Sequence, residues 1–394
     1  LTAAIDLAVT AGDRSEEGTA TSNLGTILFF LGQYEAARSL YQRSLACFQE
    51  IGDRRGEAMA LGNLGNIYRG LGRLEDARSH HQRNLAMARE TGDVRGEAIA
   101  CGNLGLVHLV AGRFEEARIA IERHLAAATE IGDRRSEVFA TANLGGVWLA
   151  LGRPALALEQ YRTNHRLSIE IAYQRGEAIA LGNLGQLNLA LGLASDAREM
   201  FERAGQLTAA IGLRPIEQEI LRGLGGVFEL EGKLEDAERQ YRAALTLCRE
   251  LEHKTGVAEA LIALSALLTR LRRLDEVEQN LGEALALARE LDLPGPRVMA
   301  TARLALLNGG DAGTAAATLA ADEYRLTWSE RIEGHFLVWK STGERRHLAE
   351  AHRLMLEFCE HAPPPARRGM IERLPLYREI DLESKRLPSP SQQP

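Results

Sequence analysis

Two polar residue types recur along this chain of 394 residues with a spacing of 40. Asparagine occupies Asn23, Asn63, Asn103, Asn143 and Asn183, and arginine occupies Arg55, Arg95, Arg135 and Arg175. An amide carries both a donor and an acceptor, so a row of asparagines can bind the backbone of an extended peptide. Arginine adds two parallel donors for a carboxylate. The pattern indicates a binding surface for an extended, acidic peptide, and Asn66 and Arg69 are expected on the same surface.

The residue before each asparagine is small, which would let a peptide backbone approach closely. These residues are Ser22, Gly62, Gly102, Ala142 and Gly182. A structural role stays open, because the asparagines could hold adjacent repeats in register and the glycines could permit close helix contacts. The arginines could also pair with Glu57 or Glu97 of a neighbouring repeat. All three features end together after the fifth repeat, whereas the fold signals Leu224, Gly225 and Ala237 persist, which favours a shared site.

The remaining reactive side chains form no pattern that performs chemistry. His80 and His81 are adjacent and His347 and His352 are five positions apart, so neither pair has the i, i+4 spacing of a helical zinc site. The chain contains no nucleophile-elbow motif and no phosphate-binding loop. We therefore expect no catalytic residue, no metal site and no cofactor, and we interpret the histidines as surface or helix-packing residues.

The composition excludes several classes of partner. A formal net charge of −7 and an aromatic content of 5% argue against nucleic acid. The four cysteines lie far apart without a Cys-x-x-Cys pair, which is typical of a reducing compartment. No run of 18 apolar residues and no signal peptide is present, so we expect a cytoplasmic protein that does not bind a membrane. The oligomeric state stays open.

The chain begins without a methionine, and residues 1–11 resemble the second helix of a repeat whose first helix is missing. We expect the sequence to be a segment of a longer polypeptide. Its peptide ligand could then be intramolecular, since tethering gives an effective concentration in the range of ~1 mM.

Glycine and aspartate divide each repeat into two predicted helices. Gly52 suits the left-handed position after a helix, and Asp53 can cap the start of the next one. A second series of glycines falls inside the repeats, at Gly32, Gly72, Gly112, Gly152, Gly192 and Gly232. This spacing predicts a first helix of about 16 residues and a second of about 18. The loops are short, so neighbouring helices should be antiparallel.

The repeat resembles the tetratricopeptide repeat, in which a Leu-Gly pair, an aromatic residue and a later alanine follow one another. Leu64, Gly65, Tyr68, Ala77 and His81 occupy these positions in the second repeat. The chain departs from the family in lacking the leading Trp and the closing Pro and in its longer period. It looks like the Pins/LGN group of polarity adaptors and similar arrays in large bacterial signalling proteins. This resemblance implies binding of extended peptide segments from partner proteins.

These observations predict an all-α fold, a right-handed α-solenoid of antiparallel helix pairs over residues 1–310. A C-terminal helical cap is expected over residues 311–380 and a disordered tail over residues 381–394. Two apolar stripes at helical spacing predict a hairpin that covers the open end of the array. The stripes are Trp328, Ile332, Phe336 and Trp339, followed by Leu348, Ala351, Met355 and Phe358. An aromatic ligand pocket at these residues is the alternative.

We therefore expect a non-catalytic scaffold or adaptor for protein–protein interaction. It would bind an extended, acidic peptide in the groove lined by the repeated asparagines and arginines. Residues 328–380 are also similar to the C-terminal ends of bacterial signalling proteins in which a kinase, a cyclase or an AAA-type ATPase precedes a tetratricopeptide array. This similarity implies a regulatory or sensor role as one alternative. A structural spacer or oligomerisation arm is the other.

Overall fold

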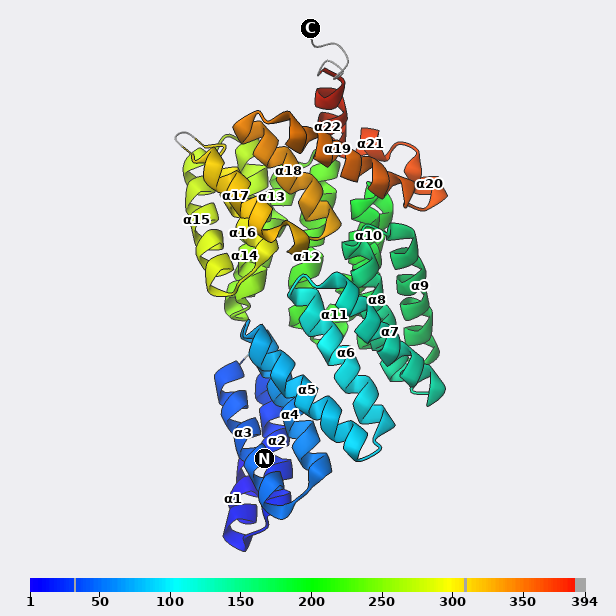
Figure 1. Ribbon diagram of the computed structural model, residues 1–394, viewed down its shortest axis with the longest axis vertical. Coiled ribbons are helices and arrows are strands. Elements are labelled where there is room, and N and C mark those ends of the chain that lie inside the picture. Colours follow the sequence, from blue (N-terminus) through cyan, green and yellow to red (C-terminus); the bar gives the residue numbers. More distant parts are fainter. Residues whose placement is uncertain (32, 308–309, 387–394) are drawn as a thin grey trace. The chain divides into compact units, whose positions relative to one another are not determined.

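The computed structural model describes residues 1–31, 33–307 and 310–386, and within these ranges it contains helices and no strand (Figure 1). The all-α fold is as predicted. Contacts along the chain divide it into two compact units, residues 1–140 and 141–394, and each is described by itself. None of the helices in the described ranges is long and apolar enough to cross a membrane.

The first unit consists of successive helix pairs. Its helices are α1 (Thr2–Ala11), α2 (Arg14–Phe30), α3 (Tyr34–Ile51), α4 (Arg54–Gly70), α5 (Leu74–Glu90), α6 (Val94–Val110), α7 (Phe114–Glu130) and the start of α8 (Arg134–Ala150). The helix α4 contacts α5, its partner in the same repeat, and also α2 and α6, the first helices of the adjacent repeats. The first helices therefore lie next to one another and form a continuous face.

The loops follow the predicted pattern of glycine and aspartate. Gly52 ends α3 with a φ of 71°, and the Asp53 carboxylate accepts hydrogen bonds from the backbone N–H groups of Arg55 and Gly56 at the start of α4. The mid-repeat glycines Gly72, Gly112, Gly152, Gly192 and Gly232 have φ values between 70° and 74°. Gly32, the first of that series, lies outside the described residues. Glycine is favoured at these positions because a positive φ strains other residues.

The residues that carry the tetratricopeptide resemblance form the core of each pair. In the second repeat Leu64, Tyr68, Ala77 and His81 are all buried. A Cβ added to Gly65 would lie 2.5 Å from the His81 ring, so glycine is needed for α4 and α5 to approach this closely.

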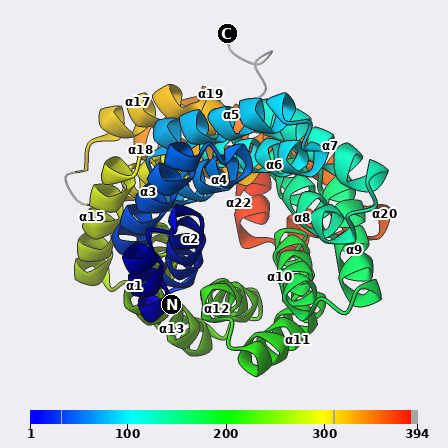
Figure 2. The ribbon, with the colours of Figure 1, turned by 90° about the horizontal axis from the view of Figure 1, so that it is seen from below.

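The second unit continues the helix pairs and ends in a set of C-terminal helices. After α8 come α9 (Pro154–Glu170), α10 (Gln174–Ala190), α11 (Ala194–Ile211), α12 (Arg214–Leu230), α13 (Leu234–Glu250), α14 (Lys254–Arg270), α15 (Leu274–Glu290), α16 (Pro294–Leu304), α17 (Ala312–Asp322), η1 (Glu323–Arg325), α18 (Trp328–Thr342), α19 (Arg345–Glu360), α20 (Pro364–Arg367), α21 (Met370–Arg373) and α22 (Pro375–Arg386). Figure 2 shows α9, α10, α11 and α12 following one another in sequence order, and each contacts the next.

One face of α18 packs against α16 and α17, but it is not the stripe that was predicted to cover the open end, since Ile332 and Phe336 belong to a different cluster. Val338 of α18 belongs to the same buried cluster as Val298 of α16 and Leu319 of α17. This cluster places α18 over the apolar side of a pair of short helices, which has no further repeat to cover it.

The opposite face of the C-terminal hairpin has a second partner that the sequence did not predict. Phe336 of α18 and Phe358 of α19 belong to one buried cluster with Tyr161 of α9 and Leu187 of α10. The backbone N–H of Ala155 also donates a hydrogen bond to the carbonyl of His361, at 3.2 Å. The hairpin thus contacts an early helix pair of its unit as well as the last one, because both of its faces are apolar.

The boundary predicted for the disordered tail, residue 381, is too early. The helix α22 continues through Arg386, where Lys385 pairs with Asp381 one turn earlier at 2.6 Å. Leu382, Glu383 and Lys385 are good helix formers, which accounts for the continuation. Residues 387–394 lie outside the described part of the chain.

Candidate functional site

Several of the predicted peptide-binding residues line one cavity in the first unit, between α4 and α6. The cavity, termed here the first-helix cavity, has a volume of ≈ 360 Å³. The predicted residues that line it are Arg55, Asn63, Asn66, Arg95 and Asn103. Two adjacent repeats therefore contribute the same residue types to a single surface.

Helical spacing explains why these side chains lie together. On α4, Arg55, Met59, Asn63 and Asn66 follow one another at intervals of four, four and three residues, so they occupy one side of the helix. The helix α6 repeats the first three positions 40 residues later as Arg95, Ile99 and Asn103. Since α4 and α6 are in contact, the two sides form one surface.

A row of exposed apolar side chains separates the arginines from the asparagines, and the sequence interpretation missed it. Met59 is 54% exposed, Ile99 is 40% exposed, and Phe139 at the same position of α8 is 39% exposed. Large apolar side chains at one repeat position, in contact with solvent, are a feature of surfaces that bind other molecules. The period of 40 in an otherwise polar stripe was the signal that could have revealed them.

The two arginines of the cavity differ in their electrostatic surroundings. Arg95 pairs with Asp133 of the next repeat at 2.9 Å. Among the described residues, by contrast, no carboxylate lies within ion-pair distance of the Arg55 guanidinium, although Asp93 lines the same cavity. The glutamates considered as partners are held elsewhere, Glu57 by Arg54 and Glu97 by Arg89. Of the two arginines that line the first-helix cavity, Arg55 is therefore the one that can bind a ligand without breaking an ion pair.

The asparagines of the cavity keep most of their hydrogen-bonding capacity. The Asn63 amide nitrogen lies 3.5 Å from the Ser22 hydroxyl of the preceding repeat, which is at the outer limit for a hydrogen bond. Asn63, Asn66 and Asn103 are all half-buried at the wall of the cavity, so they remain accessible from one side.

The other predicted residues lie elsewhere. Asn23 is exposed on α2, and Arg135 is exposed on α8, and neither lines the cavity. Arg69 is half-buried near the end of α4, where burial lowers the pKa of its guanidinium. The last three, Asn143, Asn183 and Arg175, belong to the second unit and are half-buried there.

The small residues before the asparagines serve close helix contacts in two repeats. A Cβ on Gly62 would lie 2.6 Å from the Asn84 amide nitrogen, and one on Gly102 would lie 2.4 Å from His124 Nδ1. Gly182 has no such neighbour within 4 Å. Glycine at positions 62 and 102 is therefore needed for close helix packing, whether or not a ligand binds.

A larger cavity of ≈ 670 Å³ lies in the second unit between α12, α14, α16, α18 and α22. Phe336 lines it, as the predicted aromatic pocket requires, but none of the repeated asparagines and arginines does. Of its four basic side chains, Arg270 pairs with Glu229 at 2.8 Å, Lys340 pairs with Glu379 at 3.0 Å, Arg303 pairs with Glu333, and Arg378 has no carboxylate within ion-pair distance among the described residues. Three carboxylates line this cavity and one lines the first-helix cavity, so the first-helix cavity is better suited to an acidic ligand.

The family model described as tetratricopeptide repeat matches residues 16–90, 56–130 and 217–290. No curated protein sequence matches the chain. Similar solved structures include a Rap protein complexed with competence and sporulation factor, with a TM-score of 0.62 and 12% identity over 94% of this chain and 98% of that one. The Rap conjugation gene regulator of the plasmid pLS20, in complex with the Phr* peptide, has a TM-score of 0.62 and 13% identity over 85% and 96%. Aspartyl phosphate phosphatase F from Bacillus subtilis has a TM-score of 0.52 and 14% identity over 87% and 93%. At these identities the likeness shows the fold.

Proposed function

We propose that this chain, whose residues 16–130 and 217–290 are tetratricopeptide repeats, is a non-catalytic adaptor that binds an extended peptide segment at the first-helix cavity. The observation that carries the proposal is the alignment of Arg55, Met59 and Asn63 on α4 with the equivalent residues Arg95, Ile99 and Asn103 on α6. On both helices an arginine is followed by an apolar side chain and then by an asparagine. The peptide would come from a partner protein or from another part of the same polypeptide.

The dimensions of the repeat suit an extended chain. Neighbouring helices pack about 10 Å apart, and an extended peptide advances about 3.3 Å per residue, so each repeat serves about three residues of ligand. The amides of Asn63 and Asn103 would then bind peptide groups about three residues apart. Met59 and Ile99 would contact apolar side chains that point toward the cavity wall.

The preference for an acidic ligand depends mainly on Arg55. A ligand carboxylate at this position gains a partner without displacing an existing ion pair, whereas Arg95 would have to release Asp133. Asp93 disfavours a second acidic group close by. The ligand expected here therefore carries one acidic residue next to apolar residues, instead of a continuous acidic run.

Similar folds support a peptide ligand, because one of the similar structures contains the Phr* peptide and another contains competence and sporulation factor. The fold alone does not decide between binding and catalysis, since another similar structure is named a phosphatase. Hydrolysis of an aspartyl phosphate by the purified chain would contradict the non-catalytic part of the proposal.

The test is an array of 15-residue peptides in which one acidic residue and its apolar neighbours are varied in position. Arg55→Glu should abolish binding to the acidic peptides, and the double change Asn63→Ala with Asn103→Ala should weaken binding while the melting temperature stays nearly constant. Arg83→Glu and Gln82→Ala are matched controls, because both residues are exposed on α5 of the same repeat and neither lines the cavity.

Two results would contradict the proposal. If peptides bind equally to the wild type and to Arg55→Glu, the site lies elsewhere. If no peptide binds and the chain tolerates all these substitutions, a structural spacer becomes the better interpretation.

A further inference from the structure

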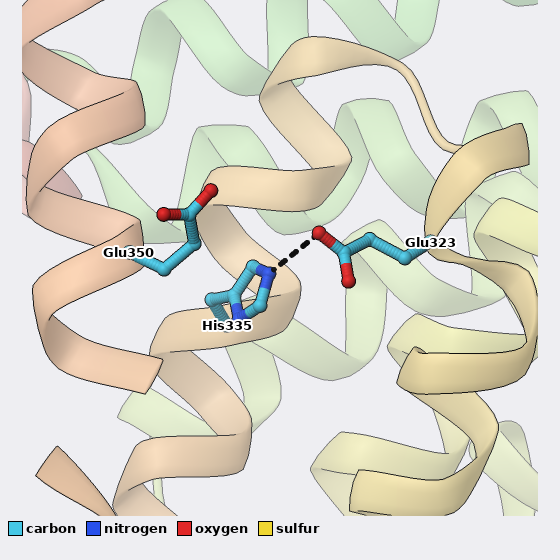
Figure 3. Close-up of side chains that lie close together, drawn as sticks. All are labelled: Glu323, His335 and Glu350. Atoms are coloured by element: carbon cyan, nitrogen blue, oxygen red, sulfur yellow. Dashed lines mark hydrogen bonds and ion pairs between the residues drawn. The ribbon is translucent and has the colours of Figure 1, made fainter. Parts of the chain in front are cut away.

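Three helical elements of the C-terminal segment bring Glu323, His335 and Glu350 together (Figure 3). Glu323 begins η1, His335 lies in the middle of α18, and Glu350 lies on α19. Each residue offers one ligand atom, and these atoms lie within 4.8 Å of one another. His335 Nε2 is 3.2 Å from a carboxylate oxygen of Glu323.

A second histidine supports His335 from the other side of its ring. His335 is only 6% exposed, and its Nδ1 lies 2.9 Å from Nδ1 of His347, which is 8% exposed. Only one proton can lie between these two nitrogens. If it is on His335, then His335 Nδ1 donates to His347 and Nε2 carries a free electron pair directed toward the carboxylates. Metal-binding histidines are oriented in this way, by a hydrogen bond from the ring nitrogen that does not bind the metal.

A cation already bridges the two carboxylates. The Arg331 guanidinium lies 3.3 Å from Glu323 and 3.8 Å from Glu350, and its Nε is buried without a hydrogen-bond partner. In the same position the Arg331 guanidinium also lies 5.4 Å from the ring centroid of Trp328, a contact that does not depend on the carboxylates. A divalent ion could therefore replace Arg331 between the carboxylates without leaving the arginine unsupported.

We propose that Glu323, His335 and Glu350 form a binding site for a divalent metal ion of the zinc class, with His347 as the residue that orients the ligating ring. One imidazole nitrogen and two carboxylate oxygens are ligands that suit Zn²⁺, Mn²⁺ or Co²⁺, whereas Ca²⁺ and Mg²⁺ prefer oxygen alone. Metal–ligand distances of about 2.0–2.2 Å require the three side chains to move only modestly closer. A fourth position would remain for water.

Such an ion would fasten η1, α18 and α19 to one another. These elements carry the C-terminal hairpin that contacts both ends of the second unit. Metal binding should therefore stabilise the second unit, because an ion that binds only the folded state shifts unfolding to higher temperature.

The experiment uses the full chain, freed of metal by chelation and titrated with ZnCl₂ at pH 7.5 while calorimetry records affinity and stoichiometry. We expect one ion per chain and a higher melting temperature in its presence. Glu350→Gln and His335→Asn should each reduce the affinity strongly, and His347→Asn should reduce it about 10–100-fold. Glu360→Gln, an exposed glutamate at the end of α19, is the matched control and should bind like the wild type.

Arg331→Gln separates a metal site from a purely structural cluster. Removal of the competing cation should raise zinc affinity if the two carboxylates bind metal, whereas a structural cluster would only lose stability. This variant and Glu350→Gln also keep the test valid if His335→Asn fails to fold. Absence of binding at micromolar zinc, or one-to-one binding that is unchanged in Glu350→Gln and Arg331→Gln, would overturn the proposal.

Discussion

Trp328, the first residue of α18, lies directly against Gly152 in the loop between α8 and α9: a Cβ built on Gly152 would come within 2.4 Å of the indole. The indole N–H donates to the carbonyl of Leu354 at 2.9 Å, which fixes the ring against α19. Arg153, the next residue of the loop, pairs with Glu357 of α19 at 3.4 Å. A glycine that the sequence assigns only to a turn thus also makes room for a contact with the C-terminal hairpin.

Gly152→Ala should therefore destabilise the second unit more than the same change at another repeat. Alanine at a φ of 70° costs about 1–2 kcal/mol, and the clash with Trp328 adds about 1–3 kcal/mol. Gly232→Ala is the matched control, because Gly232 has a φ of 74° at the equivalent position and no neighbour within 4 Å. Urea unfolding, monitored by tryptophan fluorescence, measures the loss of stability in both variants. Equal losses of stability would show that the contact with Trp328 contributes nothing.

Acid should destabilise the first unit through His81. Burial lowers the pKa of this fully buried imidazole from 6.5 to about 3, and neither ring nitrogen has a hydrogen-bond partner. Because the folded-state pKa is the lower one, the unfolded chain binds the proton first, and stability is lost as the pH falls below about 6.5. Between pH 7.5 and pH 5 the loss should be about 1–2 kcal/mol.

His81→Tyr should remove this part of the acid sensitivity. The equivalent positions of other repeats hold Tyr41 and Tyr161, so the helix pair already accommodates the larger ring. Urea midpoints at the two pH values, measured by circular dichroism, give the comparison. If the variant loses as much stability on acidification as the wild type does, another group is responsible.

The ion pair of Arg297 with Asp322 should be costly to break from one side. The Arg297 guanidinium donates to both carboxylate oxygens at 2.7 Å, and Asp322 is only 6% exposed. Arg297→Met leaves the buried Asp322 carboxylate with only the longer contact to Arg325, at 4.0 Å, and should cost about 3 kcal/mol. The double change Arg297→Met with Asp322→Leu should recover most of that loss in thermal unfolding. A double variant no more stable than the single one would contradict this account.

Replacing the glycines before the asparagines by alanine should lower stability at one position and raise it at another. Gly102→Ala should destabilise the first unit, because the new Cβ would meet the buried His124 ring. Gly182→Ala should stabilise the second unit by about 0.5–1 kcal/mol, since alanine favours the helix and open space surrounds this position. Differential scanning calorimetry of the two variants measures both changes in melting temperature. A loss of stability in Gly182→Ala would reveal a contact that the structure does not contain.

Local features of this chain could be predicted from its sequence because they depend on neighbouring residues. Gly52 and Asp53 end one helix and start the next through backbone geometry and one hydrogen-bonding side chain. The alignment of Arg55 with Asn63 follows from helical spacing, and the fixed repeat length places Asn103 beside them.

Contacts between distant residues could not be predicted in this way. The stripe of Ile332 and Phe336 shows that an apolar face exists, but nothing in its spacing says that Tyr161 and Leu187 cover it. Likewise, Glu323, His335 and Glu350 come from three separate elements, so a search for histidines one helical turn apart passes over them.

The double contact of the C-terminal hairpin also limits how this array can evolve. An open solenoid can gain or lose repeats by duplication or deletion, because each repeat needs only its neighbours. Here the hairpin must reach α16 and α17 on one face and the loop at Gly152 on the other. Insertion or deletion of one 40-residue repeat between α10 and α16 would move these two surfaces apart or together. The number of repeats in this part of the chain is therefore fixed by its geometry.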